Sequence, residues 1–137
     1  VEAQNQKFAL FRSYTKAKEL VAAATQAANE AKDAAIAGKE KAKNEAQAAI
    51  DAAKAVVAEA QTALADLGKC KRQPKDFKKD LEAMKGNLDG LAAQVTGIES
   101  AFAGEDFFGA KAQAESLKAQ VDTLKTDMAG AKTKIKC

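Results

Sequence analysis

Apolar residues recur at alternating spacings of four and three along most of this chain, the period expected of helix faces that pack against other helices. The pattern runs from residue 77 to 102 and again from 110 to 135. The two stripes consist of Phe77, Leu81, Met84, Leu88, Leu91, Val95, Ile98 and Phe102, and of Ala110, Ala114, Leu117, Val121, Leu124, Met128, Ala131 and Ile135. Residues 103–106 separate them. The spacing predicts two helices of near-equal length that run antiparallel.

The first 67 residues carry two further stripes with the same spacing. These consist of Leu10, Tyr14, Ala17, Val21, Ala24, Ala28, Ala31 and Ala35, and of Ala46, Ile50, Ala53, Val57, Ala60, Leu64 and Leu67. The second stripe is one residue out of phase with the first. A straight helix drifts by about one residue in ten turns against a 3.5-residue repeat. The phase shift therefore fits one very long helix as well as two separate ones.

Side-chain sizes are mirrored about Gly38. If the chain folds back there, the bulky residues near position 10 face Leu64 and Leu67, and the alanines of 24–37 meet those of 42–53. The mirror predicts a single domain over residues 1–137 with an all-α fold, an antiparallel up-down-up-down four-helix bundle. Its helices are expected at about 4–37, 39–67, 75–103 and 106–136. The same self-complementary pattern also suits a long first helix beside a C-terminal hairpin, completed by a dimer.

Turn and capping residues agree with the later boundaries. Gly68 can end a helix, Pro74 suits the first turn of the next, and Gly104 suits the end of that helix. Asp106 can cap the last helix.

Composition narrows the function classes. The chain has 137 residues, a net charge of +3, one proline and neither tryptophan nor histidine. Arg12 and Arg72 are the only arginines. Proteins that bind specific nucleic-acid sequences favour the planar guanidinium group of arginine, so we expect no specific nucleic-acid partner. No apolar run is long enough to span a membrane. Without histidine, a nucleophile motif or a metal-ligand pattern, we expect no enzyme activity, no cofactor and no metal site.

The two cysteines are the most informative single residues. An antiparallel hairpin brings Cys137, at the end of the last helix, back beside Cys70, just before the start of the preceding helix. We therefore expect a Cys70–Cys137 disulfide, worth about 4 kcal/mol in the chain-entropy model. Such a bridge favours an oxidising compartment, and so an extracytoplasmic location, periplasmic or secreted.

Basic residues gather at the same end of the expected bundle. They are Lys69, Lys71, Arg72, Lys75, Lys78, Lys79, Lys132, Lys134 and Lys136, and we call this set the basic pole. Lysines near a helix start oppose the helix dipole, so local stability does not explain Lys78 and Lys79. The basic pole predicts contact with an anionic surface or an acidic partner. The competing interpretation is a solvated end that keeps the protein dispersed.

Two segments resemble known families. The Ala/Lys/Glu-rich stretch from Lys16 to Lys54 resembles late-embryogenesis-abundant and exchangeable apolipoprotein helices. The segment Ala103-Gly104-Glu105-Asp106-Phe107-Phe108-Gly109-Ala110-Lys111, followed by Ala112, Ala114 and Leu117, resembles a helix start of small alanine-rich bacterial envelope proteins of unknown function. The second resemblance implies a periplasmic, secreted or lipoprotein helical bundle without assigned catalysis. Because no cysteine stands at the N-terminus, we do not expect lipidation.

These observations predict a non-enzymatic structural or interaction protein of an extracytoplasmic compartment. Its expected partner is a protein or an anionic membrane surface, and it is expected to be a monomer or a homodimer. The alternative is an apolipoprotein-like carrier of lipid or another apolar ligand, which would open its alanine-rich half to expose a stripe.

Overall fold

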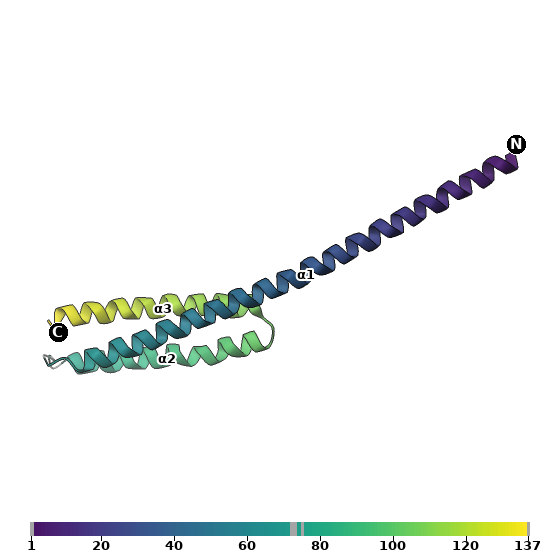
Figure 1. Cartoon of the computed structure of the whole chain (residues 1–137). Helices are drawn as coiled ribbons and strands as arrows, with labels where there is room; N and C mark the ends of the chain where they lie inside the picture. Colours follow the sequence, from purple (N-terminus) through teal and green to yellow (C-terminus); the bar gives the residue numbers. More distant parts are fainter. Residues whose placement is uncertain (1, 72–73, 75, 137) are drawn as a thin grey trace. The chain divides into compact units, whose positions relative to one another are not determined.

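The computed structural model describes residues 2–71, 74 and 76–136, with side chains described at residue 11 and from residue 13 onward. These residues form three helices and no strand: α1 (Glu2–Gly68), α2 (Phe77–Ala103) and α3 (Phe107–Lys134). The chain divides into two compact units, residues 1–40 and 41–137, and α1 contributes to both (Figure 1). The predicted all-helical class is confirmed. None of these helices has a stretch apolar and long enough to cross a membrane.

The predicted four-helix bundle is wrong, because α1 passes through Gly38 without a turn. A Cβ atom added at Gly38 would meet nothing within 4 Å, so no close approach requires glycine there. A glycine inside a helix costs only about 1 kcal/mol relative to alanine. Reversing the chain would instead break several backbone hydrogen bonds in exchange for alanine–alanine contacts of small apolar area. The alternative of a long first helix and a C-terminal hairpin fits the structure.

The second unit is a three-helix bundle. Helices α2 and α3 run antiparallel, and the second half of α1 lies along both (Figure 1). The apolar stripes of residues 46–67, 77–102 and 110–135 face one shared core. Its largest fully buried side chains are Leu67, Leu88, Leu117 and Val121. Burying each leucine or valine contributes about 1.5–3 kcal/mol, so these three faces hold the unit together.

Alanines set how closely the helices of the bundle approach. Ala46, Ala60, Ala110 and Ala114 all have 0% exposure. Small side chains at facing positions bring helix axes toward the short end of the usual 8–10 Å range. A larger residue at any of these four positions would push two helices apart.

The turn between α2 and α3 lies where the sequence predicts it, although its left-handed residue is Glu105 and not Gly104. The backbone N–H of Gly104 donates to the Ser100 carbonyl at 2.9 Å, and Glu105 takes a left-handed φ of 64°. Asp106 caps α3 by accepting a hydrogen bond from the Gly109 N–H at 2.9 Å. A Cβ atom on residue 109 would lie 2.1 Å from Asp106 Oδ2, so a larger residue at position 109 would displace the capping side chain.

Aromatic packing closes the bundle beside that turn. The rings of Phe102 and Phe107 meet edge to face, with centroids 5.2 Å apart, and Phe107 packs with the buried Ala42 and Ala46 of α1. Such ring pairs add about 0.5–1.5 kcal/mol beyond area burial. The apolar contacts of α1 with the hairpin therefore begin at Ala42, four residues after Gly38.

Candidate functional site

The structure brings the described members of the basic pole to one end of the bundle. Lys69 and Lys71 follow α1, and Lys78 and Lys79 lie in the first turn of α2. Lys132 and Lys134 lie in the last turn of α3, and Lys136 follows it. All seven are exposed. A groove lined by Asp66 and Lys132 joins the ends of α1 and α3, and another, lined by Phe77 and Lys134, joins α2 to α3. Arg72 and Lys75 lie outside the described residues.

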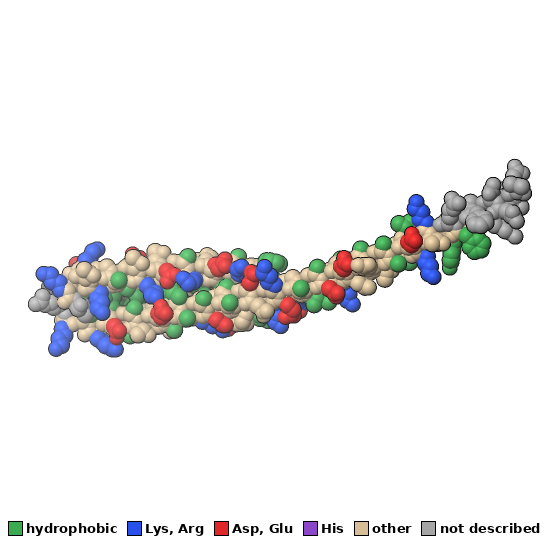
Figure 2. All heavy atoms as spheres, turned by 45° about the horizontal axis from the view of Figure 1, so that its top comes forward, with side chains coloured by type: hydrophobic (Ala, Val, Ile, Leu, Met, Phe, Trp, Pro, Cys, Tyr) green, Lys and Arg blue, Asp and Glu red, His purple; other side chains and the backbone are tan. Residues whose placement is uncertain are grey.

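Acidic residues dilute the positive charge of the basic pole. Lys69 Nζ lies 3.1 Å from Asp66 Oδ1. Three aspartates, Asp76, Asp80 and Asp127, line the groove of about 470 Å³ that also holds Lys134. Figure 2 shows the blue side chains gathered at this end with red ones nearby. The basic pole is thus a mixed surface with a positive excess, and Lys132 and Lys134 also suit the dipole at the C-terminus of α3.

Cys70 lies inside the bundle core. Cys70 is 6% exposed and belongs to the same buried cluster as Ile135, two positions before Cys137 in the sequence. The hairpin topology therefore carries the C-terminal end of α3 to the neighbourhood of Cys70, as the sequence argument requires. Cys137 lies outside the described residues, so the disulfide stays a prediction.

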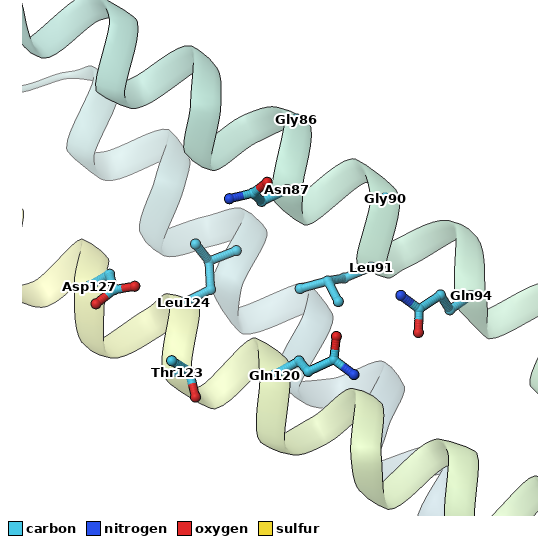
Figure 3. A pocket seen from close by; sticks show the side chains of 9 residues that line it. All are labelled: Gly86, Asn87, Gly90, Leu91, Gln94, Gln120, Thr123, Leu124 and Asp127. Carbon is cyan, nitrogen blue, oxygen red and sulfur yellow. The ribbon is translucent and has the colours of Figure 1, made fainter.

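A shallow groove of about 550 Å³ lies between α2 and α3 (Figure 3). Gly86 and Gly90 leave one wall bare, since a Cβ atom at either position would meet nothing within 4 Å. Its other lining residues are Asn87, Leu91, Gln94, Gln120, Thr123, Leu124 and Asp127. The groove thus offers amides, one hydroxyl and one carboxylate. Among the described residues, no group of three potential metal ligands is gathered here or elsewhere.

Among the described residues, three partly exposed ion pairs join α1 to the hairpin. Lys111 Nζ of α3 lies 2.8 Å from Glu45 Oε2, and Lys125 of α3 pairs with Glu59. Both pairs join residues 66 positions apart, so α1 and α3 run parallel over these 14 residues. Lys54 of α1 pairs with Glu99 of α2 on another side. Sequence reasoning missed all three pairs, because they depend on the rotation of each helix about its axis.

These pairs shift the ionisation of their members. The hydrogen bond from Lys111, and then its charge, hold the pKa of Glu45 below its ordinary value. The same hydrogen bond raises the pKa of Lys111. Glu99 and Glu59, also mainly by hydrogen bonding, raise the pKa values of Lys54 and Lys125. Within α3, the hydrogen bond from Lys118 lowers the pKa of Asp122. Each shift favours the charged, paired form.

The first unit carries five of the six large hydrophobic side chains that are exposed in the described chain. Its stripe, which we call the N-terminal stripe, consists of Tyr14, Ala17, Val21, Ala24, Ala28, Ala31 and Ala35, and every member is exposed. Tyr14 is 70% exposed and Val21 66%, and Phe11 and Leu20 beside them are 72% and 64% exposed. Figure 2 shows green side chains on the surface of this part of α1. The four–three spacing of its apolar residues was the sequence signal for this surface. The alternative of a long first helix required the N-terminal stripe to be exposed within one chain.

No family model, curated protein or solved structure matches this chain. The candidate surfaces are therefore assigned from the geometry of this chain alone.

The Glu45–Lys111 pair gives a testable coupling. In a double-mutant cycle of Glu45→Gln and Lys111→Gln, we expect the two losses of unfolding free energy to be less than additive at pH 7. Because the folded pKa of Glu45 is lowered, the coupling is complete above its unfolded value of about 4.3. It disappears as the pH falls through the lower folded pKa. Chemical denaturation at several pH values measures it.

The matched control cycle pairs Glu45→Gln with Lys43→Gln. Lys43 is exposed on the same helix, and residues two apart do not face one another. Coupling of equal size in both cycles, or coupling that survives at acid pH, would contradict the assigned pair.

Proposed function

We propose that this chain is a non-enzymatic interaction protein of an extracytoplasmic compartment that binds a helical partner through its N-terminal stripe. One observation carries the proposal: a single helix has two apolar stripes with opposite burial. Between Ala46 and Leu67 every stripe residue is buried in the bundle except Leu64, which is half-buried, whereas between Tyr14 and Ala35 every stripe residue is exposed. A continuous row of exposed apolar side chains is typical of an interaction site.

The spacing of the N-terminal stripe supports a helical partner. Alternating steps of four and three residues produce a seam that another helix fills with knobs-into-holes packing. The same spacing in residues 46–67 packs against two helices within this chain. The N-terminal stripe thus has the pattern that the bundle already uses for helix–helix contact.

The alternative of a lipid carrier has weaker support. Helices that bind a membrane surface combine a large apolar face with a strongly cationic polar face. Here both signs of charge alternate around the stripe, with Lys16 and Lys18 followed by Glu19, and Glu30 followed by Lys32 and Asp33. The alternative also required an alanine-rich half that opens, but residues 22–40 are exposed without any opening.

The basic pole supplies a second contact in this proposal. Its exposed lysines would meet an anionic surface while the N-terminal stripe holds the partner. The extracytoplasmic location rests on the predicted Cys70–Cys137 bridge, because disulfides persist in oxidising compartments. Two free thiols in protein isolated without reductant, read from intact mass after alkylation, would remove that argument.

Site-specific photo-crosslinking in the producing cell tests the N-terminal stripe. A benzophenone amino acid replaces Tyr14, whose exposed aromatic ring lies on the stripe, and in a control variant it replaces Glu19 on the opposite face. We expect the Tyr14 variant to form a discrete adduct, with a second copy or with another protein, and the Glu19 variant to form little. Equal adducts at both positions, or none at position 14, would contradict the proposal.

Vesicle binding tests the basic pole. We expect the protein to sediment with phosphatidylglycerol vesicles at low salt and less so at physiological salt, since exposed charges are screened over about 8–10 Å. Changing Lys132, Lys134 and Lys136 to Glu should abolish this binding. Changing Lys16, Lys43 and Lys85, three exposed lysines elsewhere, should reduce it less. Equal loss in the two triple variants would show a general charge effect, and binding to neutral phosphatidylcholine would favour the lipid carrier.

A further inference from the structure

We infer that the partner of the N-terminal stripe is a second copy of this chain, paired antiparallel about a two-fold axis between residues 22 and 23. The inference rests on the proposed function, which makes this stripe the binding surface. It follows from three features of residues 11–36: the order of side-chain sizes, the residues that flank the stripe, and the stretch of α1 that remains uncovered.

The order of sizes favours an antiparallel pair. The bulky members, Tyr14 and Val21, come first, and only alanine follows at 24, 28, 31 and 35. In an antiparallel pair whose layers join positions that sum to 45, Tyr14 lies across from the partner's Ala31, and Val21 from the partner's Ala24. Each large side chain then meets a small one. Facing helices pack well when large and small residues alternate across layers.

A parallel, in-register pair fits the same residues poorly. It would place Tyr14 against the partner's Tyr14 and leave four successive alanine–alanine layers from position 24 onward. Helix axes lie 8–10 Å apart according to the side chains at the contact. The tyrosine layer would hold the two helix axes apart, whereas the alanine layers need the axes close together. Voids would therefore remain in the alanine layers. The antiparallel pair keeps one spacing along its length and is isologous, as two-fold dimers are.

The flanking positions agree with the same register. Residues that follow the stripe on one side, Phe11 and Lys18, would lie beside the partner's Lys32 and Thr25. The aliphatic stem of Lys32 can cover the Phe11 ring and leave the ammonium in solvent. On the other side, Leu20 would lie beside the partner's Ala27.

The register also accounts for the exposed large residues. Of the five between residues 11 and 40, four fall in or beside the seam: Phe11, Tyr14, Leu20 and Val21. Only Ile36, which is 54% exposed, lies outside it. The later stripe, residues 46–67, is buried in its own bundle and cannot serve a second copy. This is why the axis falls near residue 22 rather than at Gly38, the centre of the mirror in the sequence.

Sedimentation equilibrium of the full chain tests the inference with a charge-complementation design. We expect wild type to show a reversible, concentration-dependent dimer. Tyr14→Glu and Ala31→Lys should each raise the dimer Kd at least about tenfold, because each places a charge in the apolar seam. An equimolar mixture of the two variants should recover most of the affinity, because the carboxylate introduced at position 14 of one chain then meets the ammonium introduced at position 31 of the other.

The design distinguishes the register as well as the surface. In a parallel pair, positions 14 and 31 lie about 25 Å apart at 1.5 Å per residue, so the mixture would not recover. Ile36→Glu is the matched control and should leave the dimer Kd unchanged. Loss in both single variants without recovery in the mixture would overturn the antiparallel register.

The failures of this inference and of the proposed function are separable. A wild-type chain that stays monomeric would overturn the self-pairing. If the Tyr14 photo-crosslink still forms, with a different protein, the proposed function stands. Dimerisation that neither Tyr14→Glu nor Ala31→Lys weakens would place the dimer contact elsewhere and overturn the inference.

Discussion

The packing of the second half of α1 against the α2–α3 hairpin determines the rest of this structure. Ala42, Ala46, Ala53 and Ala60 are buried and let α1 approach the hairpin closely, and Ile50 and Leu67 lie in the shared core. The hairpin's own stripes need this third face, since two antiparallel helices alone leave much of their apolar surface in water. Residues 42–67 are packed in the bundle, whereas the stripe that precedes them is exposed.

The consequence for function is a division of roles along one helix. Residues from Ala42 onward belong to a unit with a buried core and interhelical ion pairs. Residues before Lys41 form a separate unit with the same stripe pattern and exposed bulky side chains. Among the described residues, neither unit gathers three potential metal ligands. The first unit presents an exposed apolar stripe, and the second presents the basic pole.

The sequence predicted the structure correctly where its pattern was compatible with only one arrangement of helices. The hairpin was predictable because Gly104, the Asp106 cap and two unbroken stripes agree, and burial from Phe77 to Ile135 follows those stripes. The predicted turn at Gly38 was wrong. Side-chain sizes mirror about Gly38, but this pattern fits a folded-back helix and an intermolecular pair of helices equally well. A single glycine among strong helix formers costs too little to decide between them. The basic pole followed from the topology, but Glu45–Lys111 and Lys54–Glu99 did not, because stripe spacing sets helix faces and not the axial register of charged side chains.

The central claim is that α1 continues as one helix through Gly38, exposing its stripe before residue 41 and burying it afterwards. NMR of the full chain tests this claim most directly, through backbone Cα chemical shifts and through-space contacts across residues 34–44. The account predicts uninterrupted helical shifts and sequential amide contacts from Ala34 to Asn44. Non-helical shifts at residues 37–39, together with contacts between the alanines of 24–37 and those of 42–53 in the same chain, would contradict it.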